Sequence, residues 1–130
     1  MSQYMLLIYL PADGGLSPEE QAAESPRWYE YTEGLRSAGV HVAGDALHGI
    51  ETATTVRVRD GETQITDGPF AETKELLGGY YVIDVPDLDT ALGHAARMPS
   101  VDRGSVEVRP VIDMSKMPGW ADRAAAPAGR

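Results

Sequence analysis

The sequence predicts an α+β domain in which helices cover one face of an antiparallel sheet. Its 130 residues, 42% of them hydrophobic, have the size and composition of one soluble globular domain. Short apolar or alternating segments have the spacing of strands, and two segments have the spacing of amphipathic helices. Their order along the chain is strand, helix, two or three strands, strand, helix, strand.

The N-terminal elements begin with Tyr4–Tyr9, a continuously apolar run typical of a central strand buried on both faces. Ser17 can cap a helix, and Pro18 suits its first position. We expect this helix to end near Glu24, because Pro26 removes a backbone donor. A main helix then restarts and ends at a glycine, Gly39. Its buried face is spaced as Trp28, Tyr31, Leu35 and Ala38.

A hairpin is predicted in the middle of the chain. After a short strand at 40–44 and a loop at 45–52, Thr54–Arg59 alternates with period two. Asp60-Gly61 is a strong two-residue turn signal, so Glu62–Thr66 is expected to be the return strand. The polar segment after it begins Asp67-Gly68-Pro69-Phe70 and has room for a helical turn over 71–76.

The C-terminal elements are predicted as the strand Tyr80–Val85, a helix over Leu88–Met98 capped by Asp87, and the strand Ser105–Arg109. The buried stripe of this helix is spaced as Leu88, Ala91, Leu92 and Ala95. We therefore expect one domain over 1–112 and an irregular tail over 113–130, frayed from Ala124. Trp120 in the tail would anchor it on this subunit or on a partner.

This element order is that of a ferredoxin-like split βαβ sheet with an inserted hairpin. Helices would cover one sheet face and leave the other in need of cover. A second copy would supply that cover and close a dimeric barrel, so we expect a homodimer.

Composition excludes several classes of function. The net charge of −9 disfavours nucleic-acid binding, which depends on phosphate contacts, although Arg57, Arg59 and Arg109 leave room for a local basic patch. No apolar run reaches the roughly 20 residues of a membrane span, and no signal peptide begins the chain. The absence of cysteine fits a cytoplasmic protein. Without Walker, nucleophile-elbow or metal-ligand motifs, we expect neither cofactor nor metal.

Three blocks of sequence carry a family resemblance: Ala53–Arg57, Thr66–Glu75 and Gly78–Tyr81. They resemble the DGPF branch of the YCII-related family, and the similarity extends from Tyr4 to Val111. The resemblance implies a dimeric α+β barrel with a cleft between sheet and helices, in which a few relatives turn over small molecules. Relatives with dehydrochlorinase-type activity are thought to use a histidine–aspartate pair.

The resemblance also identifies a departure. Counted back from Gly39, the position of that histidine is Trp28, which cannot transfer protons at neutral pH. The pair is therefore absent in that form, although Asp45 can keep the acidic half.

Two groups of residues are candidates for proton transfer. In the polar segment, Asp67 or Glu72 can act as a general base while Lys74 or an arginine steadies an anion. Alternatively, Asp67 only closes a turn and Phe70 fills the core. Asp45 and His48 are three residues apart and can pair as carboxylate and imidazole, or lie incidentally in a surface loop. His41 can point into a cleft.

These candidates give two main hypotheses. In the first, a small molecule is bound by Trp28, Tyr31, Arg57, Phe70, Glu72, Lys74 and Arg109, and undergoes cofactor-free isomerisation, elimination or hydration. In the second, the protein is a non-catalytic binding or regulatory module, linked to transcription initiation as the resemblance implies for some relatives. A structural dimer with a vestigial cleft is a third reading.

Overall fold

The computed structural model describes residues 1–12 and 15–124. The larger elements, in chain order, are β1 (Ser2–Pro11), α1 (Pro18–Ser37), β2 (His41–Ala46), β3 (Thr54–Arg59), β4 (Glu62–Asp67), β5 (Glu75–Val85), α2 (Leu88–Ala96) and β6 (Ser105–Pro110). Three short helical segments complete the described chain: η1 (Ile50–Thr52), η2 (Met114–Lys116) and α3 (Trp120–Ala124). Within these residues, no helix combines the length and apolar character needed to cross a membrane.

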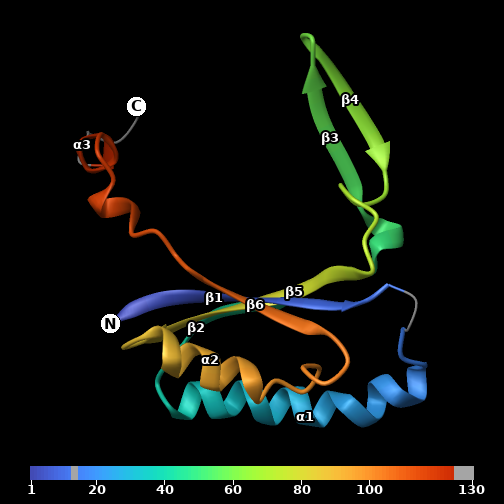
Figure 1. Cartoon of the computed structure of the whole chain (residues 1–130), viewed down its shortest axis with the longest axis vertical. Helices are drawn as coiled ribbons and strands as arrows, with labels where there is room; N and C mark the ends of the chain where they lie inside the picture. Colours follow the sequence, from blue (N-terminus) through green and yellow to red (C-terminus); the bar gives the residue numbers. More distant parts are fainter. Residues whose placement is uncertain (13–14, 125–130) are drawn as a thin grey trace.

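A four-stranded antiparallel sheet forms the body, in the order β2-β5-β1-β6. Helices α1 and α2 lie side by side on one face, and the other face is left open (Figure 1). The predicted α+β fold with an antiparallel sheet, two covering helices and a hairpin is confirmed. The predicted central position of Tyr4–Tyr9 is also right, because β1 pairs with β5 on one side and β6 on the other.

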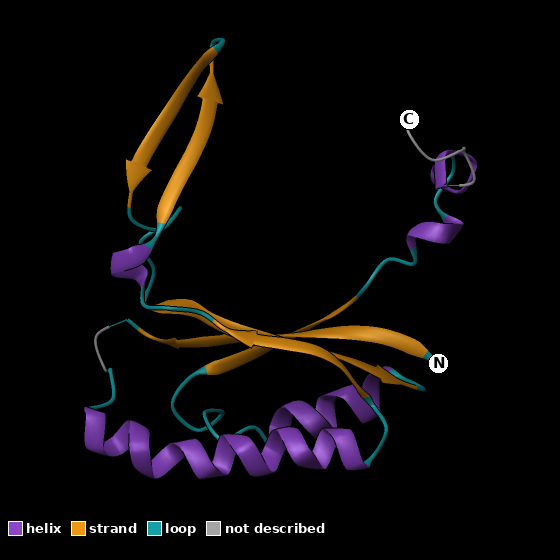
Figure 2. Ribbon diagram, turned by 180° about the vertical axis from the view of Figure 1, so that it is seen from behind, coloured by secondary structure: helices purple, strands orange, loops and turns teal. Residues whose placement is uncertain are grey.

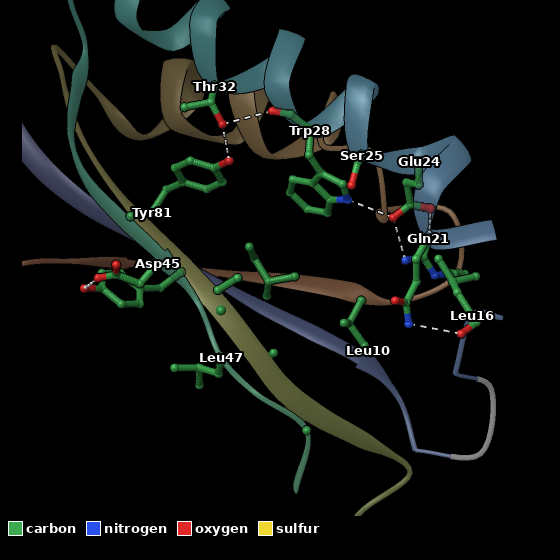
Figure 3. Close-up of a pocket in the computed structure, with 18 of the residues that line it drawn as sticks. Leu10, Leu16, Gln21, Glu24, Ser25, Trp28, Thr32, Asp45, Leu47 and Tyr81 are labelled. Carbon is green, nitrogen blue, oxygen red and sulfur yellow. Dashed lines mark hydrogen bonds and ion pairs between the residues drawn. The ribbon is translucent and has the colours of Figure 1, made fainter. Parts of the chain in front are cut away.

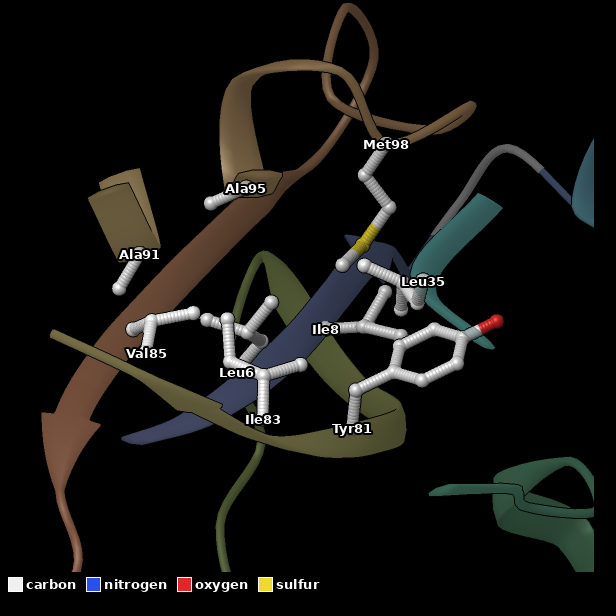
Figure 4. Packing of buried hydrophobic residues seen from close by; sticks show 9 residues of the cluster. All are labelled: Leu6, Ile8, Leu35, Tyr81, Ile83, Val85, Ala91, Ala95 and Met98. Atoms are coloured by element: carbon white, nitrogen blue, oxygen red, sulfur yellow. The ribbon is translucent and has the colours of Figure 1, made fainter. Parts of the chain in front are cut away.

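The core lies between the sheet and the helices (Figure 4). Leu6 and Ile83 are completely buried, and each contributes about 1.5–3 kcal/mol relative to an exposed side chain. The rest of the cluster comes from β1, β5, the two helices and the turn after α2: Ile8, Leu35, Tyr81, Val85, Ala91, Ala95 and Met98. Alternation along each strand then directs the intervening side chains to the open face.

Helix α1 is continuous, so the predicted break at Pro26 is wrong. Its start is as expected: the Ser17 hydroxyl accepts from the Glu20 amide, and the Glu20 carboxylate accepts from the Ser17 amide. The Trp28 indole donates to Glu24 at 2.7 Å and joins the turns on either side of the proline. This contact helps hold the helix together where Pro26 provides no backbone donor.

Strand β5 begins at Glu75, so there is no helical turn over 71–76. Its first residues extend the ladder with β1, where Tyr9 faces Leu77 and Pro11 faces Glu75. The register shifts by one residue beside Gly78, which is the bend expected from its double glycine.

Helix α2 begins at its Asp87 cap as predicted but ends at Ala96, before Met98. Only the small residues of its predicted stripe, Ala91 and Ala95, are buried, whereas Leu88 and Leu92 are exposed. The face of α2 that meets the core is therefore narrower than the predicted stripe.

Strands β3 and β4 form a separate two-stranded sheet that stands out from the body on the open side, and we call it the hairpin arm (Figures 1 and 2). Asp60 and Gly61 both have positive φ, +53° and +78°, which confirms the predicted turn. Phe70 follows the arm and is exposed, so it does not fill the core. Instead the Arg57 guanidinium lies 4.8 Å from the centre of its ring.

The chain after β6 also rises on the open side, at the opposite end from the arm (Figure 1). It forms η2 and α3, so the predicted tail is only partly irregular. Trp120 is half exposed, and the anchor predicted for it is not seen within residues 1–12 and 15–124. The expected fraying from Ala124 onward falls almost wholly on 125–130, which lie outside the described residues.

Candidate functional site

A pocket of about 630 Å³ lies between α1 and the sheet edge formed by β2 and β5 (Figure 3). Its apolar lining comes from β1, the loop before α1, α1 itself and the loop after β2: Ile8, Leu10, Leu16, Trp28 and Leu47. A concave site of this size that combines apolar walls with polar groups is typical of small-molecule binding.

An ion pair forms one polar wall. Both oxygens of Glu24 accept from Arg103, at 2.6 and 2.8 Å, and Oε1 also accepts from the Trp28 indole. The side chains of Arg103 and Glu24 are 27% and 13% exposed, so the pair is largely removed from water. The hydrogen bonds from Arg103 hold the pKa of Glu24 below its usual value, and the carboxylate stays ionised.

A chain of hydroxyls crosses from α1 to β5. The Thr32 hydroxyl donates to the Trp28 carbonyl at 2.9 Å, which uses its one hydrogen. The Tyr81 hydroxyl, 2.6 Å from Thr32, must then be the donor in that contact. Both hydrogens are therefore already engaged, and these hydroxyls can offer a ligand only lone pairs.

Tyr31 lies behind the pocket wall. Its ring packs edge-on against Trp28 and Tyr81, and its hydroxyl donates to the His94 carbonyl at 2.7 Å. Burial raises the pKa of this phenol, so it remains protonated. The side chain supports the lining and is not part of it.

His41 is the one imidazole among the described lining residues. It begins β2, and its ring lies nearly perpendicular to the Tyr81 ring, at 78°, with the centroids 6.1 Å apart. The helix-facing position agrees with the sequence expectation that His41 can point into a cleft.

Asp45 reaches the pocket at the edge strand, but its carboxylate points elsewhere. In the β2–β5 ladder Gly44 faces Tyr81 and Asp45 faces Tyr80, so the side chains of Asp45 and Tyr81 lie on opposite faces. The Tyr80 hydroxyl donates to Asp45 at 2.6 Å, and this bond raises the pKa of the phenol. The Asp45 carboxylate therefore belongs to the open face.

Most of the other predicted site residues lie away from the pocket. Asp67 ends β4, and Arg57 and Phe70 meet at the base of the hairpin arm. His48 is exposed in the loop after β2, and no described hydrogen bond joins it to Asp45. Glu72 and Lys74 are exposed before β5, and Arg109 lies on β6 beside Glu107. Of the ten predicted residues, Trp28 and Asp45 line the pocket.

Sequence reasoning missed the polar groups that the fold brings together: Glu24, Thr32 and Arg103. The spacing of Glu24 and Trp28, one helical turn apart, was an available signal for one contact. Arg103 is 79 residues from Glu24, so no local pattern could have paired them. Within the part of the chain that the structure describes, no cluster of three histidines or acids could hold a metal ion.

Comparison with known protein families matches residues 2–115 to the YCII-related domain. An uncharacterised protein of Rhizobium meliloti (strain 1021) is 51% identical over 61 residues. That alignment covers 45% of this chain and 49% of the relative, so the chain spans about half the length of this curated relative.

Proposed function

Because the chain belongs to the YCII-related domain family, we propose that it binds a small organic molecule between α1 and the β2–β5 edge and moves a proton on it without a cofactor. The observation that carries this proposal is the pocket itself. Its volume of about 630 Å³ and its Trp28 wall suit a planar organic ligand, and its polar side chains can orient such a ligand.

The charge balance of the pocket favours an uncharged ligand. Arg103 is bound to Glu24, and Arg36, the other lining arginine, is bound to Glu33 at 2.7 Å. Both positive charges are therefore compensated before a ligand arrives. The anion-binding role predicted for Arg57, Lys74 and Arg109 has no support from the pocket, because these side chains lie outside its lining.

His41 is our first candidate for proton transfer. Imidazole is the side chain that titrates nearest neutral pH, and His41 lines the same pocket as Trp28. Isomerisation, elimination and hydration each need one group to take a proton from the ligand or return it. Asp45 is the second candidate and would require its Tyr80 contact to break.

We expect the active form to be a homodimer that closes a barrel. The open sheet face carries apolar side chains, among them Met5, Leu7 and Val82, on the alternate positions to the core. A sheet with one covered face needs a second layer over such residues. A second copy would provide it.

The test is a thermal-shift screen against uncharged phenols, quinones and lactones. A ligand that binds the folded state raises its melting temperature. We expect Trp28→Ala to abolish the shift and Tyr29→Ala to keep it, because Tyr29 is the neighbouring aromatic and points to solvent. A shift that persists in Trp28→Ala, or no shift across the panel, would refute the pocket assignment.

Binding without turnover is the second candidate function. It is favoured by the orientation of the acids: Glu24 is held in an ion pair and Asp45 faces away, so no described carboxylate is free in the pocket. His41→Gln separates the two functions. Retained binding with loss of ligand conversion supports catalysis, whereas the absence of conversion in the unsubstituted protein supports a binding module.

A further inference from the structure

We propose that the hairpin arm is a clasp whose apolar face packs onto a second copy of this chain. The apolar face consists of Val56, Val58 and Ile65. This inference goes beyond ligand binding and rests on the proposed pairing of two open sheet faces.

The apolar face is set by the register of the arm. Val56 faces Ile65 across the two strands, and Val58 lies two residues further along β3, so all three side chains share one side. Val56 is 63% exposed, Ile65 71% and Val58 59%. The neighbouring positions Arg57, Arg59 and Gln64 belong to the other, polar side. The arm therefore has the two-sided pattern of a strand pair that is covered on one face.

The arm has little to hold it in place within its own chain. Figures 1 and 2 show both strands standing clear of the sheet and helices. A lone two-stranded hairpin is marginally stable in water. Exposed valine and isoleucine on a projecting hairpin thus indicate a contact with another molecule.

The same side of the molecule carries the other uncovered surfaces. The open sheet face lies between the arm and the C-terminal segment, and both project from that side (Figure 1). The segment adds exposed apolar side chains, including Ile112 and Trp120. One partner seated on the sheet would therefore lie within reach of both projections.

The charges on the open face favour a second copy as this partner. Arg109 is 69% exposed, and its nearest carboxylate among the described residues is Glu107 at a long 3.8 Å. Asp84 alternates with core residues, so it lies on this same face, and its buried Oδ1 has no described partner. In a twofold interface the same patch meets itself, so an Arg109–Asp84 contact would form twice. The net charge of −9 disfavours nucleic acid or an anionic membrane as the occupant.

The test compares Ile65→Lys with Gln64→Lys in the full chain by sedimentation velocity over a dilution series. The two positions are adjacent on β4 and point to opposite sides of the arm, and both changes add the same charge. Because each lysine reduces the acid excess, general repulsion between copies cannot explain dissociation. We expect a dimer whose dissociation constant rises about 30-fold or more in Ile65→Lys and less than about threefold in Gln64→Lys.

Val58→Thr keeps the side-chain shape and strand propensity of the arm, so it tests the contact even where Ile65→Lys disturbs the hairpin. We expect it to weaken the dimer about fivefold to tenfold. An unsubstituted protein that is monomeric overturns both the clasp and the sheet pairing. A dimer unaffected by Ile65→Lys and Val58→Thr overturns the clasp alone. Ligand binding in the pocket is tested separately, by the thermal-shift screen, whichever of these results is obtained.

Discussion

Removing the Glu24 carboxylate should destabilise the protein measurably, because it leaves the Arg103 guanidinium without its counter-ion. Breaking one partner of a fully buried pair costs about 3–5 kcal/mol, and an exposed pair is worth about 0–1 kcal/mol. With side chains 13% and 27% exposed, this pair lies between those limits. The Trp28 indole loses its acceptor as well. We therefore expect Glu24→Ala to lower the unfolding free energy by about 2 kcal/mol.

This loss of unfolding free energy corresponds to a measurable fall in the melting temperature. A chain of 130 residues has an unfolding entropy near 0.27 kcal/mol/K, at about 2.1 cal/mol/K per residue, so about 2 kcal/mol corresponds to a fall of about 7 °C. Scanning calorimetry would compare Glu24→Ala with Glu19→Ala, an exposed glutamate in the same helix that should shift by less than about 2 °C. Equal small shifts in both variants would refute the reasoning.

A double-mutant cycle and a pH series test the cause. Once Arg103→Met has removed the cation, Glu24→Ala should cost clearly less than it does alone. The pKa of Glu24 is lowered in the folded state, chiefly by Arg103, so its stabilisation is present above the ordinary value of 4.5 and is lost as pH falls through the lowered value. The difference between the unsubstituted protein and Glu24→Ala should therefore shrink below pH 4.5. A constant difference would contradict an ionic contribution.

Two further predictions concern close contacts elsewhere. A Cβ at Gly104 would overlap the backbone carbonyl of Tyr9, so Gly104→Ala should lower the unfolding free energy by about 3 kcal/mol or prevent folding. Gly34 has open space around it on α1, so Gly34→Ala should be neutral or stabilising by about 0.5–1 kcal/mol. Denaturant unfolding measures both variants. Thr32→Val should cost about 1–2 kcal/mol by leaving the Tyr81 hydroxyl without its acceptor. Adding Tyr81→Phe should recover part of that loss, and an additive effect would show that the two hydroxyls do not interact.

Local signals predicted the elements well. The Ser17 cap, the Asp60-Gly61 turn and the Asp87 cap each depend on residues within one turn of one another, and all three are present as predicted. The apolar run of β1 likewise needs only its own sequence to indicate a central strand. Order along the chain then limits the sheet to few arrangements, which is why the α+β architecture could be predicted.

The errors share a different cause, because contacts between distant segments decided them. Pro26 lies within an unbroken helix whose flanking turns are joined by Glu24 and Trp28 and tied to Arg103. Phe70 was predicted either to bind a ligand or to fill the core, but it follows an arm that projects from the body, where it is exposed and lies outside the pocket lining. Residue propensities describe the average local environment of a residue type. At Pro26 and Phe70 the surrounding structure differs from that average.

The candidate site was harder to predict because its chemistry depends on which face each side chain occupies. Asp45 and His41 are four residues apart on one strand, yet one points to the open face and the other to the pocket, since the strand bulges between His41 and Ala43. Trp28 donates to Glu24 and so helps to hold that acid in its ion pair with Arg103. The imidazole that we propose for proton transfer lies instead on β2, at His41. The activity of the pocket should then respond to His41 rather than to the acids that the sequence made prominent.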